Sequence, residues 1–91
     1  MSQRKLKRKP KAGSQQIHAM RQFYSRFGRE LTLKEYYTAI EDIQTNNAIF
    51  IEKKTNRISI FRVSCNNTPA IAVYDKLRKT IATFLTPKMI E

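Results

Sequence analysis

A histidine and an arginine one helical turn apart are the residues whose types and spacing best suit chemistry. His18, Arg21 and Ser25 stand at positions i, i+3 and i+7 of a segment whose apolar residues recur with helical spacing. Side chains at this spacing share one side of a helix. They lie on the flank of its apolar face, where His18 and Arg21 could both point into a cleft beside the rest of the fold.

Other common kinds of site lack their residues. His18 is the only histidine, Cys65 is the only cysteine and the acidic residues form no obvious pair, so a metal site has too few ligands. With Gly13 and Gly28 as its only glycines, the chain has no glycine-rich nucleotide-binding loop. The single cysteine favours a reducing, cytoplasmic setting, and no apolar run approaches a membrane span. We expect no metal, no cofactor and no membrane partner.

Positive charge dominates the composition. The 91 residues include 18 Lys and Arg against 7 Asp and Glu, a net charge of +11. Six of the basic residues precede Ser14 in a segment without an acid, and the remaining 12 still outnumber the acids. This balance indicates a polyanionic partner, most simply nucleic acid, and RNA in particular. Charge that serves only solubility is the alternative.

The basic N-terminus is predicted to be a separate segment. Residues 1–13 contain one Leu among Lys, Arg, Pro and small residues, too little apolar surface to offset the entropy of ordering. We expect a disordered arm over residues 1–13, one folded domain over 14–87 and a short tail over 88–91. The arm could hold phosphates, act as a localisation signal or only raise solubility.

Two helices are predicted before residue 48. Ser14 suits the N-cap of a first helix that ends at Phe27, with Gly28 as its left-handed C-terminal residue. Thr32 and Glu35 form a capping box for a second helix from Leu33 to about residue 46. The expected apolar faces are Ile17, Met20, Phe23, Tyr24 and Phe27 in the first helix, and Leu33, Tyr36, Tyr37, Ile40 and Ile43 in the second.

Four β-rich segments, residues 48–54, 57–64, 69–74 and 80–85, follow at short, regular spacing. Short turns containing Asn or Asp separate them, which favours an antiparallel meander. The predicted fold is therefore α+β, two N-terminal helices packed on one face of a four-stranded antiparallel β-meander.

Turn length gives a trial register for this meander. Lys54 is placed opposite Arg57, Ser64 opposite Pro69, and Tyr74 opposite Thr80. The face expected in the core then carries Ile49, Ile51, Ile58, Ile60, Arg62, Ile71, Val73, Ile81, Thr83 and Leu85. The face expected to be open carries Phe50, Phe61 and Phe84 among small residues, a surface suited to stacking on unpaired bases.

The stretches IHAMRQFYSRFG, LTLKEYYTAI and AVYDKLRKTIATFL, in this order, resemble the small two-helix-plus-sheet domains related to RelE-type, colicin-type and EndoU-type ribonucleases. Within that group the chain is most similar to a bacterial and phage family that opens with a helical His and Arg and closes with a V-Y-D and T-F-L hairpin. The resemblance covers about residues 17–87. It implies a toxin-type protein that cleaves RNA without metal, using the 2′-hydroxyl as nucleophile.

The resemblance also implies roles for particular residues. His18 would be the acid or base, Arg21 and Arg62 the phosphate clamps, and Tyr74 and Thr83 the hydroxyl donors. A Tyr, Lys or Arg would fill the second proton-transfer role, because the chain has one histidine. The ordinary alternatives are a surface His18, an ion pair of Arg62 with Glu30 or Glu35, a Tyr74 that closes the sheet edge, and an ordinary strand Thr83.

Three functions remain open at this point. The first is a metal-independent endoribonuclease with a cognate antitoxin as a partner, and it requires His18, Arg62 and Tyr74 to converge. The second is a non-catalytic nucleic-acid or ribosome-binding module, and the third is a small basic phage-type inhibitor of a host nucleic-acid enzyme. The residues expected to contact nucleic acid are Arg4, Lys5, Lys7, Arg8, Lys9, Arg57, Phe61, Lys76, Arg78 and Lys79.

Overall fold

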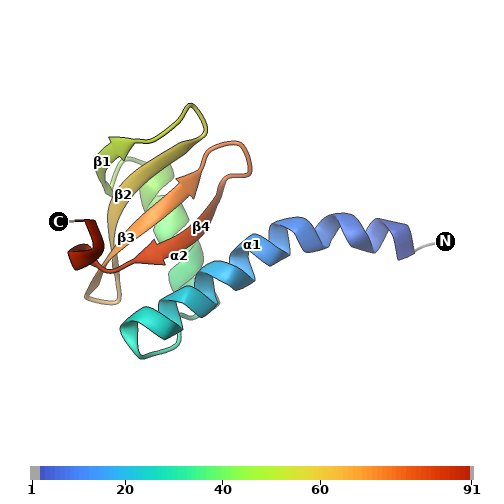
Figure 1. Ribbon diagram of the computed structural model, residues 1–91, viewed down its shortest axis with the longest axis horizontal. Helices are drawn as coiled ribbons and strands as arrows, with labels where there is room; N and C mark the ends of the chain where they lie inside the picture. The colour runs from blue at the N-terminus through green and yellow to red at the C-terminus, as the bar shows by residue number, and fades with distance from the viewer. Residues whose placement is uncertain (1–2, 91) are drawn as a thin grey trace.

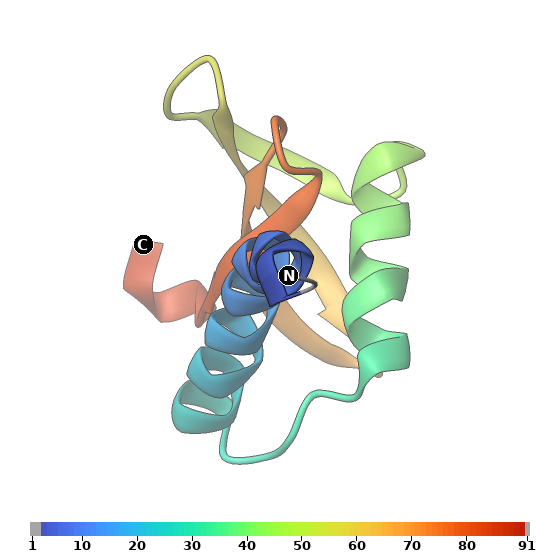
Figure 2. The same cartoon turned by 90° about the vertical axis from the view of Figure 1, so that its right-hand side faces the viewer.

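The predicted α+β architecture is confirmed in a computed structural model, which describes residues 3–90 and the side chains of residues 14–90. The elements in chain order are α1 (Gln3–Phe27), α2 (Leu33–Gln44), β1 (Ile49–Lys53), β2 (Ile58–Cys65), β3 (Thr68–Asp75), β4 (Thr80–Leu85) and the 3₁₀ turn η1 (Pro87–Ile90). The four strands form one antiparallel sheet in the order β1-β2-β3-β4, as a meander requires (Figure 1). Figure 2 shows α2 and η1 on opposite sides of this sheet.

Both helices pack on the sheet face that the sequence assigned to solvent, so the predicted assignment of faces is wrong. Ala70, Ala72 and Phe84 are fully buried against the helices, with Phe61 packed beside them. The physical reason is complementarity of size. Small strand residues leave room for large rings from the helices, and Phe23 and Tyr36 each make an edge-to-face contact with Phe84, at 5.4 and 6.3 Å between ring centroids.

The strand register is partly as predicted. Ser64 pairs with Pro69, as predicted. Ile49 pairs with Arg62, which is the pairing that follows from placing Lys54 opposite Arg57. A β-bulge between Phe50 and Glu52 then shifts the β1–β2 pairing, and a second bulge lies between Val73 and Tyr74. Thr80 pairs with Asp75 instead of Tyr74, because β3 continues through Asp75 and the turn to β4 is one residue shorter than predicted. Turn length cannot reveal a bulge, because the extra residue sits inside the strand. The second bulge also puts Ile81 on the helix-covered face, where it is fully buried.

The first helix begins earlier than expected. Its backbone is helical from Gln3, so Ser14 lies within the helix and is not its N-cap. Gly28 follows the last helical residue with φ of 76°, and its N–H donates to the Tyr24 carbonyl, as predicted. The capping box of α2 is also confirmed, by hydrogen bonds in both directions between Thr32 and Glu35.

The apolar faces of the helices are narrower than predicted. Ile17 and Tyr24 of α1 are about half exposed, and so are Leu33 and Tyr37 of α2. The buried positions are Ala19 and Phe23 in α1 and Tyr36, Ala39, Ile40 and Ile43 in α2. Periodicity did not predict the small Ala residues, which permit close approach of each helix to the sheet.

Helix side chains protect the outer edge of β4. The buried Tyr36 hydroxyl donates to the Ile81 carbonyl at 3.1 Å and accepts from the Ile81 N–H at 3.2 Å. The Arg26 guanidinium donates to the Phe84 carbonyl at 2.9 Å. These hydrogen bonds satisfy backbone groups on the edge of β4 that would otherwise pair with a further strand. Burial raises the pKa of Tyr36 to about 12, so its hydroxyl keeps its proton at neutral pH.

Replacement of Tyr36 by Phe is expected to lower the free energy of unfolding by about 1–3 kcal/mol, because both Ile81 backbone groups lose a buried partner. Urea denaturation measures the change. Tyr37→Phe is the matched control, since that hydroxyl binds Gln16 at the surface. Equal losses in the two variants would contradict this role for Tyr36.

Candidate nucleic-acid interface

The β1–β2 and β3–β4 turns lie side by side at one end of the sheet. The N–H of Lys76 donates to the carbonyl of Arg57 at 2.8 Å and joins the two turns directly (Figure 1). The β2–β3 turn lies at the other end, where Arg29 donates to the Cys65 carbonyl at 2.7 Å. A meander therefore brings the first and third turns together, although about 20 residues separate them in the sequence.

Six basic residues converge at this end, which we call the basic end. They are Lys53, Lys54, Arg57, Lys76, Arg78 and Lys79. All six are exposed, and the acidic residues in the same strands and turns are Glu52 and Asp75. The four salt bridges found among the described side chains leave Lys53, Lys76 and Lys79 without an acidic partner.

Helix α1 contacts the basic end. Gln15 of α1 donates to the Asp75 carboxylate at 3.4 Å and also contacts the Thr80 hydroxyl. Residues before Gln15 continue the helix beyond the sheet, as Figure 1 shows. This part of α1 contains Arg4, Lys5, Lys7, Arg8 and Lys9, whose side chains lie outside the described part of the structure, so their predicted contact with phosphates stays a prediction.

A single buried carboxylate organises the basic end. Asp75 is 1% exposed and accepts two hydrogen bonds from the Arg57 guanidinium, at 2.9 and 2.8 Å. It also accepts from the backbone N–H groups of Leu77 and Arg78, at 3.0 and 3.1 Å. The Asp75 carboxylate therefore connects the β1–β2 turn, α1 and the β3–β4 turn at one point.

The Asp75 carboxylate stays ionised because its partners outweigh the effect of burial. The hydrogen bonds from Arg57 lower the pKa of Asp75 far below its ordinary value, with smaller contributions from the Arg78 N–H and Gln15. Burial acts in the opposite direction. The same pair raises the pKa of Arg57. Arg57, predicted to contact nucleic acid, thus has a structural partner.

The structure does not bring the predicted catalytic residues together. Tyr74 is buried on the helix-covered face, where its hydroxyl accepts from Gln44 at 3.0 Å. Arg62 is exposed on the opposite face. Tyr74 pairs with Ser59 of β2, and Arg62 lies three positions further along β2, where the side chain points to the other side of the sheet. Thr83 shares the side of Arg62 and lies 3.4 Å from the Arg26 guanidinium. The alternative ion pair of Arg62 with Glu30 or Glu35 is not among the salt bridges of the described side chains, and Glu35 pairs instead with Arg29 at 3.2 Å.

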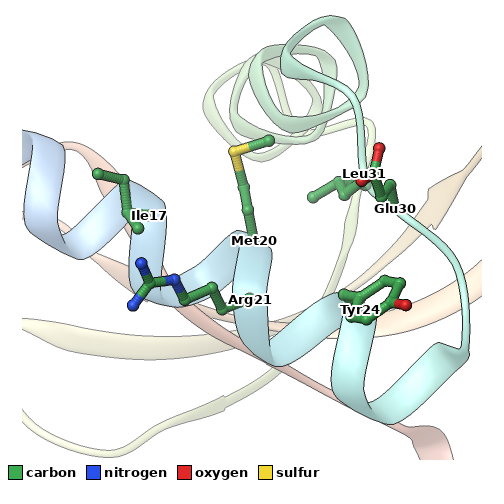
Figure 3. A pocket seen from close by; sticks show the side chains of 6 residues that line it. All are labelled: Ile17, Met20, Arg21, Tyr24, Glu30 and Leu31. Carbon is green, nitrogen blue, oxygen red and sulfur yellow. The ribbon is translucent and has the colours of Figure 1, made fainter.

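His18 and Arg21 are exposed on α1, away from Tyr74. Arg21 lines an open groove of about 440 Å³ between α1 and the loop that follows it (Figure 3). The other lining residues are mainly apolar: Ile17, Met20, Tyr24, Glu30 and Leu31. Figure 3 shows Arg21 directed along the helix toward Ile17, away from Tyr24 and Glu30. The groove thus lacks the converging acid, base and cation that RNA cleavage needs.

The predicted stacking surface is not formed. Phe84 is fully buried, and Phe61 is packed between the rings of Phe50 and Tyr74, with centroid distances of 5.6 and 6.2 Å. Phe50 alone of the three predicted rings is largely exposed. Phe61, predicted to bind nucleic acid, therefore belongs to the packing of the sheet against the helices.

Other reactive chemistry finds no support among the described residues. Burial raises the pKa of the Cys65 thiol to about 11, so it is protonated and unreactive at neutral pH. No group of three or more potential metal ligands occurs in the part of the chain that the structure describes. Over the same part, every helix is too short or too polar to cross a membrane.

Sequence reasoning missed Lys53, Lys54 and Leu77 as neighbours in this interface. The signal that could have found them is the predicted meander itself, in which the first and third turns must share an end. The role of Asp75 could not be found this way, because its partners come from three elements and depend on register.

Comparisons with protein-family models, with curated proteins and with solved structures give no match for this chain. The resemblance to RelE-type, colicin-type and EndoU-type ribonucleases therefore stays a prediction.

Replacement of Asp75 by Asn is expected to lower the free energy of unfolding at pH 7 by about 1–3 kcal/mol, since the charge-assisted bonds to Arg57 are weakened. Because the pKa of Asp75 is lowered in the folded state, its stabilising effect is present above about pH 4 and is lost as the pH falls below that value. The difference between wild type and variant should narrow from pH 5 to pH 2 in urea titrations.

Glu52→Gln is the control, because both side chains of the Glu52–Lys54 ion pair are more than half exposed and such a pair adds little stability. A constant difference between wild type and the Asp75 variant at all pH values would contradict the ionised role of Asp75.

Proposed function

We propose that the chain is a non-catalytic nucleic-acid-binding module that binds RNA with its basic end. The observation that carries this proposal is the convergence of six exposed cations from two separate turns and the adjoining end of β1. Clustered cations produce a stronger local positive potential than scattered ones, and this potential attracts a polyanion.

The contrast with the other end of the sheet supports this choice. There Arg29 is neutralised by Glu35, donates to the Cys65 carbonyl and lies over the Phe23 ring at 5.2 Å. Its guanidinium thus stabilises the fold. At the basic end, by contrast, Lys53, Lys76 and Lys79 have no acidic partner among the described residues and remain available to phosphates.

Binding without cleavage is proposed because of the positions of the expected catalytic groups. Arg62 and Tyr74 point to opposite faces of the sheet, and Tyr74 is 6% exposed with its hydroxyl bound by Gln44. Proton transfer to or from RNA requires hydrogen-bond reach of the reacting oxygen. With Tyr74 on the helix-covered face and Arg62 on the other face, the two side chains do not converge on one phosphate.

The double substitution Lys76→Ala, Lys79→Ala is expected to weaken RNA binding and to reduce its salt dependence. Each phosphate that the variant no longer neutralises should lower the slope of log K against log salt by about 0.7 for a single strand. Fluorescence anisotropy with a labelled single-stranded RNA at several salt concentrations measures both quantities.

Lys34→Ala, Lys88→Ala is the matched control, since it removes the same charge from positions outside the basic end. If both double variants lose affinity equally, net charge alone drives binding and the proposed interface is wrong.

Total cellular RNA incubated with the purified chain and a chelator is expected to stay intact, as read on a denaturing gel. Cleavage that a His18→Ala, Tyr74→Phe variant loses would contradict this expectation and would establish the endoribonuclease instead.

A further inference from the structure

The most exposed large apolar side chain among those described lies at the tip of the basic end. Leu77, in the β3–β4 turn, is 72% exposed, more than Ile49 or Tyr24 elsewhere on the surface. Its immediate neighbours are Lys76, Arg78 and, one residue on, Lys79. An isolated exposed Leu is common, but one surrounded by cations at the end of a turn is placed where a polyanion would arrive.

The backbone of this turn is held rigidly. All four of its N–H groups donate: Lys76 to the Arg57 carbonyl, Leu77 and Arg78 to the Asp75 carboxylate, and Lys79 to the Asp75 carbonyl at 2.7 Å. Lys79 adopts φ of 57°, which closes the turn. The backbone that carries Leu77 is thus ordered before any partner binds, so little backbone conformational entropy is lost on contact.

The fold does not need this side chain. Leu77 is absent from the core cluster, and the bonds that fix the turn come from its backbone and from Asp75. The Leu77 side chain can therefore contact a partner without loss of core packing.

We infer that Leu77 is an apolar wedge that inserts between neighbouring unpaired bases of an RNA strand held by the surrounding cations. This inference rests on the proposed function and adds the mode of contact. Apolar side chains on basic DNA-binding surfaces, Leu among them, enter base steps in this way. Unpaired RNA bases resist separation less than a paired step does, since no base pair is distorted.

An anionic lipid surface is the other partner that a basic turn with an apolar tip could meet. Stable insertion in a membrane interface requires a larger apolar surface, such as the face of an amphipathic helix. The β3–β4 turn offers Leu77 alone, because Lys76, Arg78 and Lys79 are its other residues. The structure therefore favours nucleic acid.

The test compares wild type with Leu77→Ala on a single-stranded RNA that carries 2-aminopurine, whose fluorescence rises when its neighbours unstack. The variant is expected to bind about tenfold more weakly with an unchanged salt slope, since it loses apolar contact and no charge. It should also lose the fluorescence rise. Leu33→Ala is the control, because Leu33 is 52% exposed at the start of α2, outside the basic end.

Each other outcome has a distinct meaning. Equal affinity and equal fluorescence for wild type and Leu77→Ala would overturn the wedge and leave RNA binding by the basic end intact. Failure of the wild type to bind RNA would overturn both proposals. Binding of wild type, but not of Leu77→Ala, to phosphatidylserine vesicles, with unchanged RNA affinity, would assign Leu77 to a lipid surface and overturn the wedge.

Discussion

The Asp75 carboxylate is the interaction on which the basic end depends. It is removed from water, yet Arg57, Gln15 and two backbone N–H groups of the next turn satisfy it. A buried charge with fewer partners would be destabilising. Here the lowered pKa of Asp75 reflects a folded state that favours the ionised form. One anion thus fixes a surface that is otherwise positive.

Asp75 also offsets the repulsion among the cations of the basic end. Six cations at one end of a small sheet repel each other, and this repulsion would favour opening of the turns. Asp75 binds Arg57 closely and lies 3.9 Å from Arg78, so it neutralises part of the charge inside the structure. The lysines at the outer positions keep their charge for a partner. A structural anion and a functional cation surface therefore share the same two turns.

Much of the fold could be predicted from local signals. Gly28 and the Thr32 and Glu35 capping box depend on near neighbours in the sequence, and the meander follows from short turns. The assignment of faces failed because it depends on which side the helices cover. Apolar content suggested the Ile-rich side, whereas the helices bring large rings that need the Ala-rich side.

The candidate site was less predictable for the same reason. Arg62 and Tyr74 were grouped by chemical type, but strand alternation separates them. The bulge near Tyr74 and the partners of Asp75 depend on long-range packing, which a single sequence does not display. The cation clusters at the two turns were visible in the sequence, and the meander topology explains why they meet.

The most direct test of the account is to map the RNA-binding surface on the folded chain. Backbone amide NMR shifts should be followed while a short single-stranded RNA is added. If RNA binds at the basic end, the shifts concentrate at residues 53–57 and 76–79, with little change at the β2–β3 turn, Asn66 and Asn67. Shifts centred on that turn or on α2, or none at saturating RNA, would contradict it.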